Sequence, residues 1–442
     1  MRRESAGLLL AVLLAGCASL APEKRHSPAE IAGYTPAQFS APIASRDGAR
    51  QARDRALAAI RQAQAQDQAQ ARGANDALVA QALWAVAFYD IEHAAGRALL
   101  QTALGPSAPA LAQRPVEQQR ALLSAAHMLD AAGTAPLIRP VMDLLARPRE
   151  FAIAAYTLLR ADGSPAQRDA LRSLLARRSD RDDPRLRALA QVLDPPASAS
   201  PAPPLVDLLT AAFKPGLPVV YSLQRRDRRH IGLALVRGAD GRFVRQADGS
   251  VFHIPHLALA LTQLPGTLTN GNTPQGLYTV VGAGTAENPW IGPTPYLESK
   301  VPVEASLAEF AHAAMDGNWT EARYEAWLPP SWRVHPPFKE AWLAGLAGRS
   351  EMLLHGTTID PQPYRHQPWY PGTPSAGCLV ALETWSPDDG RGLHSDQLRL
   401  VQAFTRDGLD RGYLVVVDID DTAGPVRWLD VAAAVTRAEA VR

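Results

Sequence analysis

The sequence predicts an α+β protein with several domains, in which a helical domain precedes a β-rich domain that carries a helical insertion. Apolar residues recur at helical spacing between residues 49 and 194. Short β-branched runs bounded by glycine and proline dominate after residue 215. A stretch rich in proline, alanine and serine separates the two patterns. At 442 residues the chain has room for two or three domains.

The first 17 residues predict export from the cytoplasm. Arg2 and Arg3 precede the apolar run Leu8–Leu14, which is too short to span a bilayer. The following Ala15-Gly16-Cys17 resembles the end of the lipobox of bacterial lipoproteins, where the cysteine carries lipid. This resemblance implies a signal peptide over 1–17, lipidation of Cys17 and attachment to a membrane without a spanning helix. An ordinary signal peptide with an incidental cysteine is the alternative.

Ala18 follows the cysteine at a position where inner-membrane lipoproteins more often have aspartate. By the same resemblance, we expect a cell-envelope lipoprotein at the outer membrane, facing the periplasm. Composition then predicts a tether over 18–48, a helical domain over 49–194 and a proline-rich linker over 195–215. A β-rich domain over 216–421 and a C-terminal helix or tail over 422–442 complete the chain.

The helical domain is predicted to be a stack of helical hairpins. Trp84, Phe88 and Tyr89 fall on one of its predicted helices, where they could pack in the core or form a sugar-binding platform. In the β-rich domain, strands are predicted at 219–223, 231–236, 242–245, 276–281, 351–355 and 413–418. A helical insertion is predicted over 304–345, with tryptophans that could line a groove or pack internally.

Charge and residue counts exclude several kinds of partner. The 45 basic and 44 acidic residues give a net charge of +1, so there is no argument for nucleic-acid binding. No histidine pair has metal-ligand spacing, and we expect neither a metal nor an organic cofactor. The chain has two cysteines, and if Cys17 carries lipid, Cys378 has no partner for an internal disulfide.

The surroundings of Cys378 favour a reactive thiol. An apolar run ends in His355 and Gly356, and small residues around Gly377 present the cysteine. Nucleophilic cysteine chemistry needs the thiolate, and a nearby histidine can act as the base. Backbone N–H groups at Gly377 and Cys378 could stabilise an oxyanion. The sequence alone does not show that the two residues meet.

These segments resemble the catalytic domain of L,D-transpeptidases (the YkuD type) over about residues 216–421. The family's first histidine matches His355-Gly356, and its Ser/Thr-His-Gly-Cys motif matches Ser375, Gly377 and Cys378. The stretch 273–278, Thr-Pro-Gln-Gly-Leu-Tyr, is similar to the strand that precedes these motifs in the family. The resemblance implies that Cys378 attacks the diaminopimelate carbonyl of a tetrapeptide stem and releases D-alanine, with His355 as the base and the Gly356 carbonyl orienting it.

The sequence departs from the family at several positions. Ala376 stands where the family has a second histidine, Val380 replaces a common arginine, and the interval from His355 to Cys378 is longer than usual. The extra residues make Arg365 and Tyr370 candidates for substrate binding, together with Ser375 and Thr357. Transfer to an amine, hydrolysis as an L,D-carboxypeptidase, and a non-catalytic peptidoglycan-binding role remain open. The helical domain could also recruit another envelope protein.

Overall fold

The computed structural model describes residues 24–68, 76–105, 108–195 and 202–441. Among these, residues 50–195 and 261–271 form one compact unit, here called the helical unit. The rest form a second, here called the barrel unit. The protein is therefore of mixed α+β class, as the sequence predicts. No helix within the described ranges is long and apolar enough to cross a membrane. Cys17 and the predicted signal peptide lie outside the described residues.

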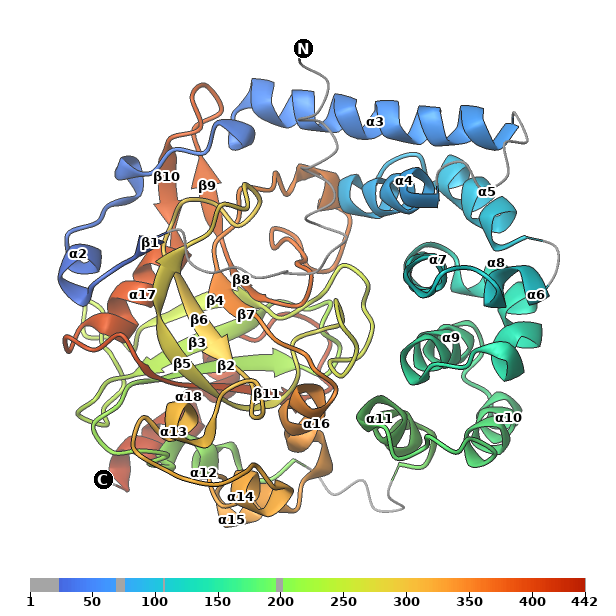
Figure 1. Cartoon of the computed structure of the whole chain (residues 1–442). Helices are drawn as coiled ribbons and strands as arrows, with labels where there is room; N and C mark the ends of the chain where they lie inside the picture. The colour runs from blue at the N-terminus through green and yellow to red at the C-terminus, as the bar shows by residue number, and fades with distance from the viewer. Residues whose placement is uncertain (1–23, 69–75, 106–107, 196–201, 442) are drawn as a thin grey trace. The chain divides into compact units, whose positions relative to one another are not determined.

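The helical unit is a succession of helices joined by short connections (Figure 1). α9 lies at its centre, contacts α7, α8, α10 and α11, and is buried along most of its length. Proline at the first turn and a capping side chain start two of the helices, with Ser164 accepting from Gln167 N–H and Asp183 from Arg185 N–H. The helices are α3 (Arg46–Gln68), α4 (Asp76–Tyr89), α5 (His93–Leu104), α6 (Ala108–Ala112), α7 (Val116–Leu129), α8 (Ala131–Ile138), α9 (Pro148–Ala161), α10 (Pro165–Ala176) and α11 (Pro184–Leu193).

A loop from the β-rich half of the sequence, residues 261–271, belongs to the helical unit. Leu264 and Leu268 are fully buried in the core of that unit. The backbone of Gln263 hydrogen-bonds to the buried His127, whose pKa burial lowers to about 3. The predicted boundary at residue 194 therefore does not divide the chain completely, because this loop returns to the helices.

Eight strands close into a barrel in the second unit. Their order is β5-β11-β2-β3-β4-β8-β7-β6, and β6 pairs again with β5, which closes the ring. The parallel pairs are β11 with β2 and β7 with β8. The strands are β2 (Val219–Arg225), β3 (Gly232–Arg237), β4 (His253–Leu257), β5 (Gly276–Thr285), β6 (Tyr296–Lys300), β7 (Met352–His355), β8 (Leu379–Ala381) and β11 (Gly412–Asp420).

Alternate strand residues and residues from several helices form the core of the barrel unit. α17 (Asp396–Thr405) packs against β3, β4, β6 and β8, and places Leu400, Val401 and Phe404 in this core. A small hairpin, β9 (Glu383–Trp385) with β10 (Gly392–Ser395), precedes α17. The predicted insertion is helical, with α13 (Leu307–Ala311), α14 (Glu321–Glu325), α15 (Pro330–Arg333) and α16 (Glu340–Leu346).

Two segments expected to be extended connections are folded onto the barrel unit. From Lys24 onward, the predicted tether forms β1 (Lys24–Arg25), which pairs with β5, and α2 (Pro28–Ala32), whose Ile31 is fully buried. The end of the predicted linker forms α12 (Leu205–Thr210), with Leu208 and Leu209 fully buried. α12 packs against α18 (Trp428–Ala440), which occupies the C-terminal region. Burial of a few apolar residues outweighs the extended preference of the surrounding prolines and alanines.

Candidate active site

The two motif residues meet because β7 and β8 are neighbouring parallel strands. His355 ends β7 and pairs in register with Val380, while Cys378 immediately precedes β8. The backbone N–H of Leu353 lies 3.4 Å from the sulfur of Cys378. Since Leu353 and His355 are two residues apart on a strand, their side chains share a face. The thiol of Cys378 lies 3.7 Å from the carbonyl oxygen of Glu351, and its interaction with the imidazole raises the pKa of His355.

The face that carries Cys378 is not the barrel core. Leu354 and Leu379 point into the core, whereas Leu353 and Cys378 belong to a separate apolar cluster. The other members of that cluster are Ala286 and Ile291, on the segment between β5 and β6, and Tyr296, the first residue of β6. The side chain of Cys378 is 3% exposed and that of His355 is 6% exposed. The segment 286–295 therefore covers the thiol in this conformation.

Backbone geometry orients the histidine. The Nδ1 atom of His355 lies 2.5 Å from the carbonyl oxygen of Gly356. If Nδ1 donates this hydrogen bond, Nε2 is the nitrogen free to accept a proton from the thiol. Burial lowers the pKa of His355, but interaction with Cys378, the bond to Gly356 and the charge of Glu383 raise it, and the net pKa is raised. The interaction with Cys378 thus favours the protonated form of His355.

Glu383 binds the backbone two residues after His355. The sequence did not predict a role for this residue. Its Oε2 accepts from the N–H of Thr357 at 2.9 Å, and its Oε1 accepts from the hydroxyl of Ser395 at 2.6 Å. Burial raises the pKa of this carboxyl to about 7, against the lowering effects of its hydrogen bonds and of His355. An acidic residue after a short strand gives no sequence signal for such a role.

Hydrogen bonds within the turn fix the position of Cys378. The hydroxyl of Ser375 donates to the carbonyl of Cys378 at 2.8 Å and accepts from the N–H of Gly377 at 2.9 Å. The hydroxyl of Thr273 donates to the carbonyl of Gly377 at 3.0 Å. Gly377 has a φ of +123°, a conformation that favours glycine. The N–H of Gly377, expected to stabilise an oxyanion, is therefore engaged by Ser375, and Ser375 serves the turn.

The other predicted substrate-binding residues occupy two kinds of environment. Thr357 is buried, and its hydroxyl accepts from the hydroxyl of Thr373 at 3.0 Å, so it holds two loops together. Arg365 is exposed, and its backbone N–H donates to the carbonyl of Gln362 at 3.2 Å, whereas its side chain makes no hydrogen bond or ion pair within the described part of the chain. Tyr370 is 39% exposed, and its hydroxyl accepts from Gln362 at 3.3 Å. The structure thus leaves Arg365 and Tyr370, but not Thr357, at the surface.

The aromatic loop 361–372 is packed on its own cluster. Tyr364 and Trp369 are buried with Leu257 and Leu259. This cluster is distinct from the one that contains Cys378. The loop that covers the thiol is consequently 286–295, which the sequence analysis did not single out. The segment 286–295 also contacts Thr358, whose hydroxyl donates to the carbonyl of Pro289 at 2.5 Å.

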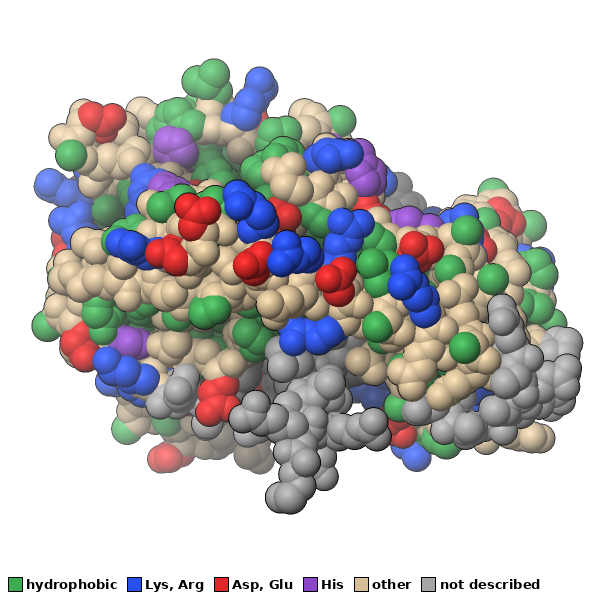
Figure 2. All heavy atoms as spheres, turned by 90° about the horizontal axis from the view of Figure 1, so that it is seen from above, with side chains coloured by type: hydrophobic (Ala, Val, Ile, Leu, Met, Phe, Trp, Pro, Cys, Tyr) green, Lys and Arg blue, Asp and Glu red, His purple; other side chains and the backbone are tan. Residues whose placement is uncertain are grey.

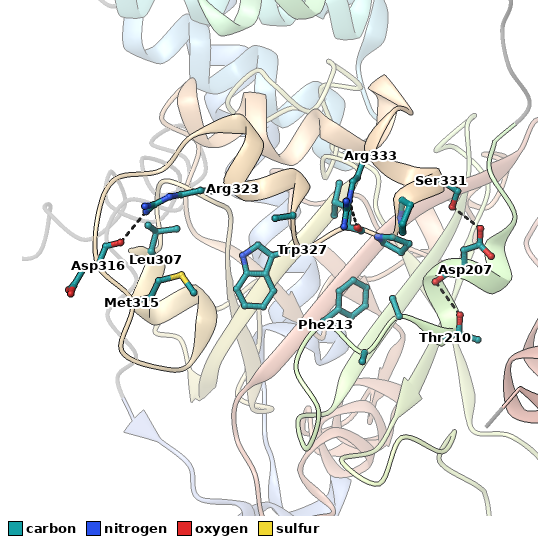
Figure 3. A pocket seen from close by; sticks show the side chains of 16 residues that line it. Asp207, Thr210, Phe213, Leu307, Met315, Asp316, Arg323, Trp327, Ser331 and Arg333 are labelled. Carbon is teal, nitrogen blue, oxygen red and sulfur yellow. Dashed lines mark hydrogen bonds between the residues drawn. The ribbon is translucent and has the colours of Figure 1, made fainter.

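One cavity of the barrel unit lies on elements that do not carry the thiol. It measures about 1130 Å³ and is lined by residues of α12 to α15 and their connections (Figure 3). Trp327 and Phe213 face it, and Arg323 and Arg333 lie at its edge, where each guanidinium donates to backbone carbonyls. Of the four tryptophans of the insertion, only Trp327 lines this cavity.

On the face drawn in Figure 2, basic and acidic side chains alternate without a large patch of one sign. Among the described residues, no group of three or more His, Cys, Asp or Glu side chains is placed to hold a metal ion.

Comparison with known proteins gives no relative: no family model, curated protein or solved structure matches this chain.

Proposed function

We propose that this chain is a cysteine acyltransferase of the L,D-transpeptidase type that acts on peptidoglycan stem peptides. The observation that carries the proposal is the placement of His355 at the end of β7 and of Cys378 immediately before its parallel neighbour β8, with Nδ1 of the histidine directed to the carbonyl of Gly356. This arrangement leaves Nε2 for the thiol. The motif resemblance around both residues supplies the substrate class.

The proposed reaction has two steps. His355 takes the proton of Cys378, and the thiolate attacks the diaminopimelate carbonyl of a tetrapeptide stem. The tetrahedral intermediate collapses to a thioester as D-alanine leaves, protonated by the imidazolium. An acceptor amine then attacks the thioester, loses its proton to His355 and releases the thiol. If water replaces the amine, the same steps give an L,D-carboxypeptidase.

The thiol is 3% exposed beneath segment 286–295, so this segment must move before a stem peptide or water reaches it. After acylation, an acceptor stem held beside the thioester would react faster than free water, because its amine is already positioned for attack. Attachment through lipid on Cys17, at the outer membrane and facing the periplasm, is part of this proposal and rests on the lipobox resemblance.

The test uses purified protein and tetrapeptide muropeptides, with Cys378→Ala beside the wild type and mass spectrometry of the products. Cysteine-dependent loss of D-alanine with crosslinked dimers is expected. Loss of D-alanine without dimers would replace transfer by hydrolysis. Absence of any cysteine-dependent product would overturn the proposed donor chemistry and favour a peptidoglycan-binding role, which a pull-down with purified peptidoglycan then measures.

A further inference from the structure

The strand that carries His355 is held at both of its ends by a carboxyl group. Beyond the end of β7, Glu383 accepts from the N–H of Thr357 at 2.9 Å. Immediately before β7, Oε1 of Glu304 accepts from the N–H of Glu351 at 2.8 Å. Glu304 lies in the turn between β6 and α13, 47 residues earlier in the chain than Glu351.

Glu304 binds two backbone segments at once. Its Oε2 accepts from the N–H of Val301 at 3.0 Å, while its Oε1 accepts from the N–H of Glu351. Val301 directly follows β6, and β6 pairs with β7. The carboxyl therefore joins the end of one strand to the start of its neighbour.

The backbone of Glu351 faces the thiol. Glu351 has a φ of +58°, in the left-handed region that residues with a side chain rarely adopt. Its N–H bonds to Glu304, and its carbonyl oxygen lies 3.7 Å from the sulfur of Cys378. Because the N–H and the carbonyl belong to one residue, the bond from Glu304 restricts the direction in which this carbonyl points.

The thiol has neighbours with opposite effects on its ionisation. The N–H of Leu353 donates to the sulfur at 3.4 Å and favours a thiolate, as does a protonated imidazole of His355. The carbonyl of Glu351 can accept a hydrogen bond only from the neutral thiol, and its partial negative charge opposes a thiolate. A carbonyl that cannot turn away therefore makes the thiolate harder to form.

The charges around Glu304 come from three neighbouring segments. Burial raises the pKa of Glu304 to about 7, although the two N–H bonds and the charge of Lys300 lower it and the carboxyl of Glu351 raises it further. Lys300 on β6 also pairs with Glu309 at 2.7 Å and lies 3.9 Å from Glu298. Above about pH 7 the side chain of Glu304 is a carboxylate, which accepts the two N–H bonds more strongly than the protonated acid does.

We propose that Glu304 is a positioning residue of the active site, which holds the carbonyl of Glu351 against the thiol and so keeps Cys378 neutral until His355 accepts its proton. The proton then moves from the sulfur to the imidazole, and no other group gains or loses one. This role rests on the proposed function only in that Cys378 is the nucleophile, and it requires no particular acyl donor.

The experiment follows alkylation of Cys378 by iodoacetamide in the full chain, with mass spectrometry of the peptide that contains this residue. For each protein, the rate at about pH 6 is divided by the limiting rate at basic pH, so the ratio reports how readily the thiol ionises. Glu304→Gln and Glu304→Asp should each raise this ratio about two- to tenfold, the factor for one hydrogen bond. Glu304→Asp keeps the charge but shortens the side chain by one methylene group.

Glu309→Gln is the matched control, because it removes another carboxylate beside Lys300 and should keep the wild-type ratio. An unchanged ratio in both Glu304 variants, or an equal rise in Glu309→Gln, would overturn the proposal. A rise in Glu304→Gln but not in Glu304→Asp would also overturn it, because charge rather than contact would then be responsible. A change in the limiting rate alone would leave Glu304 a structural role only and overturn the positioning role.

Two further measurements separate this role from a loss of folding and from the proposed function. Thermal melting shows whether each variant is folded, and hydrogen exchange of the Glu351 N–H should be faster in both Glu304 variants. Iodoacetamide replaces the stem peptide in these assays. Failure of the proposed acyl transfer and failure of this positioning role therefore give different results.

Discussion

Glu383 occupies the space that a side chain on Gly356 would need. A Cβ built on Gly356 would lie 2.0 Å from Oε2 of Glu383. The carboxyl is held there by Ser395 and by the N–H of Thr357, and it has little room to withdraw. Gly356 in turn supplies the carbonyl that orients His355. The requirement for glycine after the histidine therefore comes from a buried carboxyl 27 residues later in the chain.

Gly356→Ala is expected to lower both stability and thiol reactivity. The added methyl group must displace Glu383 or the Gly356 backbone, and overpacking of this kind costs about 1–3 kcal/mol. Thermal melting measures the loss of stability, and the rate of Cys378 alkylation measures the disturbance of the histidine. Gly163→Ala is the control, because a Cβ there would meet one atom at 3.6 Å. Equal behaviour of the two variants would contradict the steric argument.

Glu383→Gln is expected to change how stability depends on pH. Burial raises the pKa of Glu383 to about 7 from its ordinary 4.5, so the folded protein holds this proton more tightly than the unfolded chain. The contribution to the free energy of unfolding is complete below pH 4.5 and is lost as the pH rises to about 7. The full loss is about 3 kcal/mol.

Denaturant unfolding of the wild type and of Glu383→Gln across this pH interval measures the effect. The wild type should lose stability relative to the variant as the pH rises, whatever the offset between the two proteins at low pH. A constant difference across the interval would show that Glu383 does not take up a proton on folding.

His355→Gln is expected to slow acylation of Cys378 by about 10²–10⁴-fold, the range for loss of a general base. The variant keeps a polar side chain but cannot accept the thiol proton at neutral pH. The rate is measured with a carbapenem as the acylating agent and mass spectrometry of the adduct. His394→Gln, at an exposed position, should react as the wild type does. A similar rate in both variants would remove His355 from the proposed role.

Ile291→Ala is expected to increase the rate of Cys378 alkylation several-fold. Ile291 is 4% exposed and packs in the cluster that contains the thiol, so truncation loosens the covering segment. Ile359→Ala is the matched control, because Ile359 packs against the aromatic cluster of Tyr364 and Trp369 instead. A larger effect from Ile359→Ala would identify the loop 361–372 as the cover.

Local patterns predicted most strands of the barrel. The β-branched runs at 219–223 and 413–418 became β2 and β11, because such residues fit the pleated, buried surface of a sheet. The expected strand at 242–245 did not join β3 as a full hairpin. It makes only isolated bridges, and β4 takes the place beside β3. Pairing between distant strands depends on the whole sheet, which a local pattern does not contain.

The folded parts of the predicted tether and linker could not be recognised from composition. Ile31 is one apolar residue in a stretch rich in alanine and proline, yet it is fully buried in the barrel core. In the site, motif spacing was enough to select His355 and Cys378. Glu383 and the covering segment around Ile291 act through contacts between distant parts of the chain. No residue type or spacing near them indicates that contact.

The position of β11 sets the order in which the site can be assembled. β11 lies between β2 and β5, although it is the last barrel strand to leave the ribosome. Cys378 and His355 are synthesised before it, at a time when the barrel that aligns their strands cannot yet be closed. A growing chain therefore carries the thiol and the base before the closed barrel aligns them. We expect Cys378 to become reactive only after β11 has been synthesised and has joined the sheet.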